Sequence, residues 1–253
     1  MPLGLGPATA GNKILRFFCK TSRAAVERAL RATQMPGSIP PAILALVAAY
    51  LIGGIPFGYL VVKWTTGADV RASGSGNIGA TNVLRTTGRA AGFVTLLLDI
   101  AKGFFSVWLA SKLTGGNIHW MSAAALAVMA GHAFPIFLHF KGGKAVASFV
   151  GAFLYLTPIP LLAVIAVFLA AVIYTRHVSL GSVLAAGTFP LAVWLLMQPP
   201  LSVVGASIVS AAFIIYRHRA NIARIRAGTE HVLLLGGRKP TESTQSDWRT
   251  RRP

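Results

Sequence analysis

Long apolar stretches separated by short polar connections run through most of the 253-residue chain. Several approach the ~20 residues that a helix needs to cross the ~30 Å hydrocarbon core of a bilayer. The apolar residues are continuous, whereas strands of a membrane barrel alternate apolar and polar positions. The pattern predicts an all-α, polytopic membrane protein with seven transmembrane helices. The first four lie at about 41–64, 90–113, 120–138 and 145–156, a fifth ends near 174, a sixth near 197, and a seventh covers about 201–216.

The first apolar stretch also carries helix-breaking and small residues, at Gly53, Gly54, Pro56 and Gly58. Small residues allow close approach of neighbouring helices, and proline interrupts the hydrogen bonds of a helix. We therefore expect close packing and a kink in this stretch.

Two polar, glycine-rich connections interrupt the apolar pattern, and we call them the first polar loop (GSGNIGATNVLR, 74–85) and the second polar loop (FKGGK, 140–144). In the first, glycines at 74, 76 and 79 permit positive φ, which can turn backbone N–H groups into one concavity that binds an anion. A helix beginning near Ala80 would add its N-terminal amides. In the second, two glycines separate Lys141 from Lys144. Phosphate binding is one interpretation; an ordinary glycine-rich turn and lysines that anchor at the membrane interface are the others.

Charge is distributed unevenly, with 24 Lys and Arg against 6 Asp and Glu. In a soluble protein, this excess of positive charge would indicate nucleic-acid binding. Here the cations lie mainly in the connections and the C-terminal tail, where they determine topology and attract anionic lipid. With seven spans, sixteen cations fall on the side of both polar loops and the C-terminus, and seven on the other. The positive-inside rule therefore predicts that the polar loops and the C-terminus are cytoplasmic and that the N-terminus lies outside.

Residues 1–38 form a basic N-terminal extension that we expect to be dispensable, and the sequence does not choose among its origins. Within it, 1–34 could be a surface-lying amphipathic segment, a targeting segment or a stretch upstream of a true start at Met35. Residues 39–234 are predicted to form the seven-helix membrane domain, and 235–253 a basic, disordered tail.

Few charges lie inside the predicted spans. Asp99 and Lys102 are three residues apart, on one face of a helix, and an isolated charge there costs on the order of 3 kcal/mol. We therefore expect the two to pair. His132 is expected to be a histidine of the bundle interior rather than a catalyst.

The inventory of reactive groups is small. Outside the terminal segments the acids are Asp69, Asp99 and Glu230, too few for a paired-carboxylate hydrolase or a carboxylate-rich magnesium site. The single cysteine, Cys19, cannot build a thiolate metal site, and no G-x-S-x-G nucleophile elbow is present. A reaction at the loops must therefore need little general-base strength or take it from the substrate.

Six motifs follow one another along the chain: GGIPFGYL at 53–60, SGNIGATNVLRTTG at 75–88, DIAKG at 99–103, GHAFPIFLHFKGGKAVAS at 131–148, RHVSLGS at 176–182 and RHRANIARIRAGTE at 217–230. In these motifs, over roughly residues 39–234, the chain resembles the bacterial acyl-phosphate:glycerol-3-phosphate acyltransferase family (PlsY type). Two positions depart from the family pattern. Ile78 stands where the family usually has proline, and Ala145 where it usually has glycine.

The resemblance implies a seven-helix fold with its active site at the cytoplasmic face. Ser75, Arg85 and Lys144 match phosphate-binding positions and, with Ser179 and His218, form the predicted catalytic set. The predicted substrate-binding residues are Gly76, Asn77, Thr81, Asn82, Gly142, Gly143, Asn221 and Glu230, with Arg224 near them.

The resemblance also implies the reaction: transfer of a fatty acyl group from acyl phosphate to the 1-hydroxyl of glycerol 3-phosphate, giving lysophosphatidic acid for phospholipid synthesis at the bacterial plasma (inner) membrane. Acyl phosphate is an activated anhydride, so the attack needs positioning and charge neutralisation more than a strong base. The expected partners are these two substrates and membrane lipid, without nucleic acid, cofactor or metal. The alternative is a transporter or channel for phosphate-like anions, whose site would lie near the membrane midplane rather than at one face.

Overall fold

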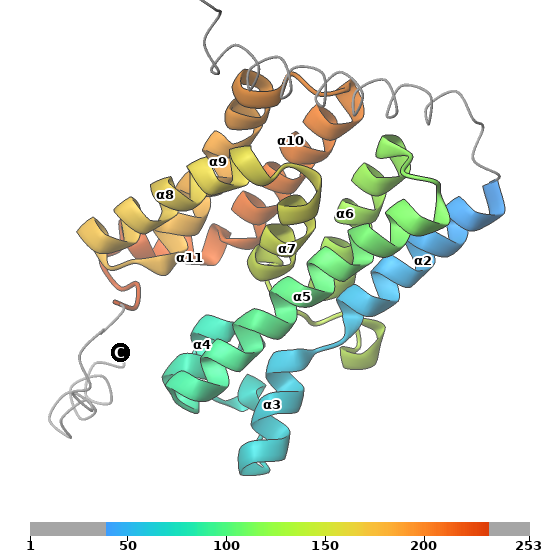
Figure 1. The fold of residues 1–253 in the computed structure, drawn as a ribbon. Coiled ribbons are helices and arrows are strands. Elements are labelled where there is room, and N and C mark those ends of the chain that lie inside the picture. The colour runs from blue at the N-terminus through green and yellow to red at the C-terminus, as the bar shows by residue number, and fades with distance from the viewer. Residues whose placement is uncertain (1–38, 233–253) are drawn as a thin grey trace, which may run out of the picture. The chain divides into compact units, whose positions relative to one another are not determined.

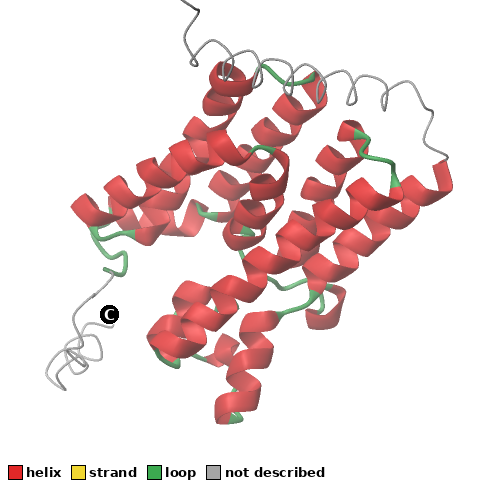
Figure 2. Cartoon of the chain, viewed as in Figure 1, coloured by secondary structure: helices red, strands yellow, loops and turns green. Residues whose placement is uncertain are grey.

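The structure is a computed structural model that describes residues 39–232. It consists of two compact units, residues 39–158 with 199–206 and residues 159–198 with 207–232, which we describe separately. Within this range the regular elements are all helical (Figure 2). The predictions for the extension at 1–38 and the tail at 235–253 lie outside the described residues.

Helices occupy all seven stretches where the sequence predicts spans (Figure 1). The first unit contains α2 (Ile39–Gly54), α3 (Phe57–Thr66), η1 (Val70–Ala72), α4 (Ala80–Thr86), α5 (Arg89–Leu113), α6 (Ile118–Ala133), η2 (Ile136–Leu138) and α7 (Val146–Leu156). The second contains α8 (Pro158–Thr175) from its second residue, α9 (Val178–Met197) and α11 (Arg219–Arg226), while α10 (Leu201–Arg217) has residues in both units.

Within residues 39–232, five helical stretches are long and apolar enough to cross a membrane: Pro40–Thr66, Arg89–Leu113, Ile118–Leu138, Pro158–Thr175 and Val178–Met197. The pair α10–α11, bent by 54°, would be a sixth. Helix α7 has 11 residues, and at about 1.5 Å per residue it is shorter than the hydrocarbon core. The all-α membrane fold is thus confirmed, and the number of seven crossings stays a prediction.

Two helix pairs of the first unit pack through reciprocal glycines. A side-chain carbon on Gly53 of α2 would collide with the backbone of α6, and one on Gly131 of α6 with the backbone of α2. Likewise, a side-chain carbon on Gly103 of α5 would collide with the backbone of α7, and one on Gly151 of α7 with the backbone of α5. Helices in lipid associate through such close packing, because lipid is as apolar as the helix surfaces. The helices that carry both polar loops are held in place by these contacts.

The kink expected in the first span is present. Helix α2 ends at Gly54 and α3 begins at Phe57, and Pro56 lies between them. Proline has no N–H to donate and cannot continue the hydrogen-bonded ladder.

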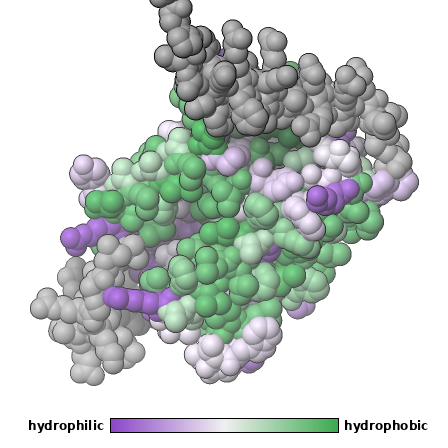
Figure 3. Space-filling model, in the orientation of Figure 1, coloured by the Kyte–Doolittle hydropathy of each residue, from purple (hydrophilic) through white to green (hydrophobic). Residues whose placement is uncertain are grey.

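Apolar side chains cover much of the visible face of the described chain (Figure 3). In the second unit, large apolar side chains of α8 and α9 are at least 60% exposed, namely Ile159, Leu162, Ile173, Leu191 and Leu195. In the first unit, α2 and α5 expose Ile43, Leu44, Phe93 and Phe105. Soluble monomers rarely expose patches of this kind, and lipid tails fit them.

Candidate active site

The side-chain amide of Asn82 shapes the first polar loop. Asn82 lies on α4 and is 2% exposed. Its Oδ1 accepts a hydrogen bond from the Ser75 N–H at 2.8 Å. Its Nδ2 lies within hydrogen-bond distance of the carbonyls of Val70 (3.3 Å), Ser73 (3.1 Å) and Asn77 (2.9 Å). One buried amide thereby fixes the backbone on both sides of Ser75.

The glycines of this loop follow the prediction in part. Gly74 and Gly76 have φ of 60° and 68°, as expected. Gly79 has φ −76°, so the prediction of positive φ is wrong there. Its N–H donates to the side-chain oxygen of Asn77 at 2.8 Å, and it takes the extended backbone usual for the residue before a helix. Helix α4 begins at Ala80, as predicted.

Three amides of the first polar loop donate hydrogen bonds within the loop. The N–H groups of Ser75 and Gly79 donate to side-chain oxygens, and that of Gly76 donates to the Ser73 carbonyl at 3.1 Å. These three amides are therefore already engaged, because each donor satisfies an acceptor of the loop itself. The side chains of Ser75 and Arg85, in contrast, are exposed.

The Arg85 side chain is oriented by the short helix that carries it. Its Nε donates to the carbonyl of Thr81, one turn earlier on α4, at 3.2 Å. A guanidinium is planar and presents its N–H donors in a fixed fork that suits phosphate. Thr81 therefore contributes its backbone to the site in this structure.

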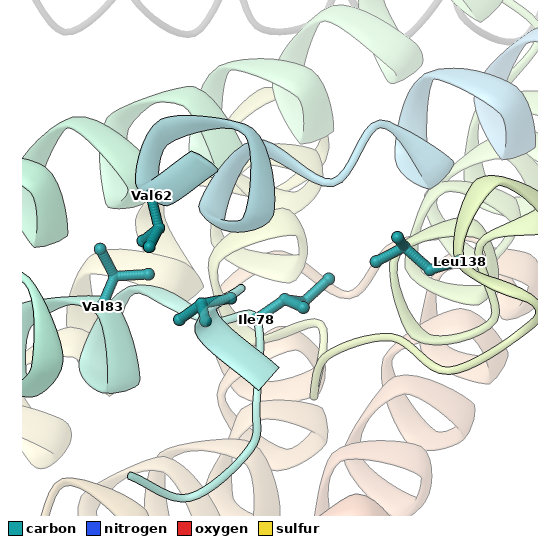
Figure 4. Packing of buried hydrophobic residues seen from close by; sticks show 5 residues of the cluster. Val62, Ile78, Val83 and Leu138 are labelled. Carbon is teal, nitrogen blue, oxygen red and sulfur yellow. The ribbon is translucent and has the colours of Figure 1, made fainter. Parts of the chain in front are cut away.

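An apolar cluster joins the two polar loops. Ile78 of the first loop is 3% exposed and packs with Val62, Val83 and Leu138, and Val70 completes the cluster (Figure 4). Leu138 ends η2, immediately before the second loop. A glycine in α3 lets the Ile78 carbonyl lie directly against that helix. Ile78 thus secures the first loop by burial, at a position where proline would do so by fixing φ.

The second polar loop folds back on the end of α6. The N–H of Gly142 donates to the Ala133 carbonyl, and that of Gly143 to the His132 carbonyl, both at 3.1 Å. Lys144 follows this turn and is partly buried. Ala145 then has φ 62° and ψ 10°, a left-handed conformation that glycine adopts at no steric cost.

Buried charges lie directly behind the second loop. Lys102 Nζ is 2.8 Å from Asp99 Oδ1, and both side chains are 2% exposed, so the predicted ion pair is confirmed. Lys102 also donates to the Ile55 carbonyl at 2.8 Å, at the break between α2 and α3. His132 is buried, as expected, with Nδ1 3.7 Å from Asp99 Oδ1 and 3.3 Å from Ser148 Oγ. The contact of this group with the second loop was not predicted, since spacing along one helix says nothing about its neighbours.

In the second unit, Glu230 gathers three polar side chains. Its Oε1 accepts from Ser179 Oγ at 2.8 Å and from Asn221 Nδ2 at 2.6 Å. Its Oε2 accepts from Arg224 Nε at 2.7 Å. Burial favours the neutral acid, but the hydrogen bonds from Asn221, Ser179 and Arg224 outweigh it and lower the pKa of Glu230. Glu230 is therefore a carboxylate that accepts hydrogen bonds, and it is a weak base.

His218 precedes α11 and is buried. Its Nδ1 lies 2.8 Å from the Ile214 carbonyl. A carbonyl can only accept, so Nδ1 carries the proton, and in the neutral ring Nε2 is the acceptor.

The structure thus assembles the predicted residues in groups. Ser75, Gly76, Asn77, Thr81, Asn82 and Arg85 form one loop, and the apolar cluster connects it to the loop of Gly142, Gly143 and Lys144. In the second unit, Ser179 and Asn221 both donate hydrogen bonds to Glu230. In the described part of the chain, no three His, Cys, Asp or Glu side chains are placed to hold a metal ion.

Fold and sites together define an all-helical integral membrane protein with polar groups in its loops and on the helices beside them. The family model for glycerol-3-phosphate acyltransferase matches residues 43–228. A glycerol-3-phosphate acyltransferase of Geobacter sulfurreducens is 47% identical over 75% of this chain and 96% of its own length. One of Desulforamulus reducens is 46% identical over 74% and 93%. The chain belongs to the glycerol-3-phosphate acyltransferase family.

Solved structures agree with this assignment. The crystal structure of PlsY (YgiH), an integral membrane glycerol 3-phosphate acyltransferase, in its glycerol 3-phosphate form has a TM-score of 0.71 and 37% identity, over 81% of this chain and 98% of that one. The lysophosphatidic acid form has a TM-score of 0.69 and the same identity, over 76% and 94%.

Proposed function

We propose that this protein transfers a fatty acyl group from acyl phosphate to the 1-hydroxyl of glycerol 3-phosphate, releasing lysophosphatidic acid and inorganic phosphate. One observation carries the proposal: the loop of Ser75 and Arg85 and the loop of Lys144, which hold the family's motifs, share a single apolar anchor at Ile78 and Leu138. The solved relative exists in a glycerol 3-phosphate form and a lysophosphatidic acid form, which correspond to acceptor and product.

The reaction needs charge neutralisation and alignment. The hydroxyl oxygen of glycerol 3-phosphate attacks the acyl carbonyl carbon, the bond from that carbon to the phosphate oxygen breaks, and phosphate leaves with the electron pair. Lys144 and Arg85 neutralise the phosphates, and the Ser75 hydroxyl donates to a phosphate oxygen. Because phosphate is a weakly basic leaving group, it needs no acid to depart.

The proton of the attacking hydroxyl passes to a phosphate oxygen of the substrate. Glu230 is not the base, because its hydrogen bonds hold its pKa low. It fixes the hydroxyl of Ser179 and the amide of Asn221 instead. Gly76, Asn77, Gly142 and Gly143 shape the backbone beside the phosphates.

The protein acts in this proposal at the inner face of the bacterial plasma membrane, with its N-terminus outside and its C-terminus in the cytoplasm. Support comes from the excess of cations on the side of the polar loops. Acyl chains come from the membrane and glycerol 3-phosphate from the cytoplasm. Reporter fusions at the C-terminus and at Gly115 check the orientation: an alkaline phosphatase that is active at the C-terminus and inactive at Gly115 would contradict it.

The reaction is tested with purified protein in detergent or a lipidic phase, given palmitoyl phosphate and labelled glycerol 3-phosphate. Labelled lysophosphatidic acid and inorganic phosphate should appear in equal amounts, and palmitoyl coenzyme A should not replace the donor. Failure to form lysophosphatidic acid, with labelled glycerol 3-phosphate crossing proteoliposomes instead, would show that the protein is a transporter.

The role of Lys144 is tested against Lys141, an exposed lysine of the same loop. Lys144→Ala should lower kcat/KM at least about 100-fold, the usual cost of removing a charge-stabilising donor. Lys141→Ala should leave kcat/KM within about threefold of the unmodified protein, since an exposed charge in water contributes little. Equal effects of the two changes would remove the assignment of Lys144 to the phosphates.

A further inference from the structure

Four buried polar side chains of the first unit take no part in the proposed reaction, yet they lie in one connected group: Asp99, Lys102, His132 and Ser148. They come from three helices, α5, α6 and α7. Ionisable residues inside a membrane protein are costly and usually have a function beyond packing. The question is what this group does.

The group ends at the second polar loop. The imidazole of His132 lies against Gly143, where an added side-chain carbon would collide with the ring. The His132 carbonyl accepts the Gly143 N–H at 3.1 Å. His132 therefore holds Gly143 from two sides, through its ring and through its backbone, and Lys144 is the next residue.

The ring of His132 is itself held. Its Nδ1 lies between Ser148 Oγ, at 3.3 Å, and Asp99 Oδ1, at 3.7 Å. Asp99 in turn is fixed by Lys102 at 2.8 Å. A side chain supported in this way has one orientation, and supporting contacts of this kind make a site accurate enough to act.

We propose that His132 is a positioning residue for Lys144: its ring, oriented by Asp99 and Ser148, sets the backbone of Gly143 and thereby the direction in which the Lys144 ammonium points. The inference rests on the proposed role of Lys144 at a substrate phosphate. It assigns to the buried ion pair a part in substrate binding, through His132, in addition to its contribution to stability.

The test compares His132→Gln and Ser148→Ala with Lys144→Gln and a control, Ser122→Ala. Ser122 is a buried serine of the same helix α6 whose hydroxyl donates to the Ile118 carbonyl one turn away. Glutamine keeps a hydrogen-bonding side chain but lacks the ring that lies against Gly143. A displaced Lys144 ammonium would bind a substrate phosphate more weakly, because a charge-assisted hydrogen bond depends on its distance and direction.

Lys144→Gln first identifies the substrate whose KM depends on the lysine. For that substrate, His132→Gln should raise KM about tenfold and Ser148→Ala about threefold, with kcat changed less than threefold. Ser122→Ala should leave both constants unchanged. The double variant His132→Gln/Lys144→Gln should have no higher KM than Lys144→Gln alone, because the histidine acts through the lysine.

Thermal midpoints and calorimetric binding of glycerol 3-phosphate accompany the kinetics. A purely structural histidine would lower the midpoint of His132→Gln and leave KM for both substrates unchanged, and that result would overturn the inference while leaving the proposed reaction intact. Additive effects of His132→Gln and Lys144→Gln would also overturn it. If the unmodified protein forms no lysophosphatidic acid, the proposed function fails, and this inference fails with it.

Discussion

Replacing Ala145 by glycine tests the backbone strain at the start of α7. Ala145 has φ 62° and ψ 10°, and its side chain is buried. The left-handed conformation costs an L-residue roughly 1–2 kcal/mol, which glycine does not incur. Removing the buried methyl costs about 0.8 kcal/mol. The two effects nearly cancel, so we expect Ala145→Gly to change the free energy of unfolding by less than about 1 kcal/mol.

Ala152 provides the matched control. It is also buried, with 0% of its surface exposed, but it lies inside α7. Glycine in a helix interior costs about 1 kcal/mol, and the lost methyl adds about 0.8 kcal/mol. Ala152→Gly should therefore destabilise the protein by about 2 kcal/mol, which corresponds to a Tm roughly 4–8 °C below that of Ala145→Gly.

The measurement is thermal unfolding in detergent, followed by the fluorescence of the five tryptophans. Both variants lose one buried methyl and gain one glycine, so the difference between their Tm values isolates the backbone conformation. Equal losses of Tm would show that Ala145 is not strained, and the reasoning from its φ would be refuted.

Three further predictions follow from the other contacts. Ile78→Ala should lower the free energy of unfolding by about 2–4 kcal/mol and Ile78→Val by about 1 kcal/mol, because the buried side chain anchors the loop. An alanine variant with an unchanged chemical unfolding curve would contradict this. Asn82→Ala should lower Tm and raise KM more than Asn77→Ala does, since the Asn82 side chain contacts four backbone groups and the Asn77 side chain accepts one hydrogen bond. Equal effects of the two changes would argue against Asn82 as the residue that shapes the loop. The pKa of folded Glu230 lies below its ordinary value of 4.5, so its stabilisation should be complete above about pH 4.5 and lost as the pH falls through the folded pKa. Glu230→Gln should flatten the dependence of Tm on pH in that acidic range, and an unchanged profile would exclude Glu230 as its source.

The helices could be located from the sequence because continuous apolar stretches leave few alternatives. The break in the first span was also predictable, since Pro56 among Gly53, Gly54 and Gly58 both interrupts a helix and permits close contact. The pairing of Asp99 with Lys102 followed from their spacing on one helical turn. These features depend on local sequence and on the cost of a charge in lipid.

The roles of individual loop residues could not be derived in the same way. Asn82 was expected to bind substrate, yet its amide is engaged by backbone groups that lie 5 to 12 residues earlier. Which carbonyls reach an asparagine depends on the path of the loop, and that path depends on the burial of Ile78 against α3 and η2. Gly79 likewise looked like its neighbours Gly74 and Gly76, but the hydrogen bond of its N–H to Asn77 keeps it extended.

The contact of Lys102 with the Ile55 carbonyl has a consequence for the broken first span. Helix α2 ends inside a predicted membrane crossing, where the partial negative charge at a helix C-terminus has no water to solvate it. The Lys102 ammonium lies at that end, so it serves as a C-cap supplied by another helix. Many buried ion pairs can be exchanged for apolar residues at no loss. This pair cannot be exchanged freely, because removing Asp99 and Lys102 together would also take the ammonium from the Ile55 carbonyl and leave it with the Phe57 N–H alone.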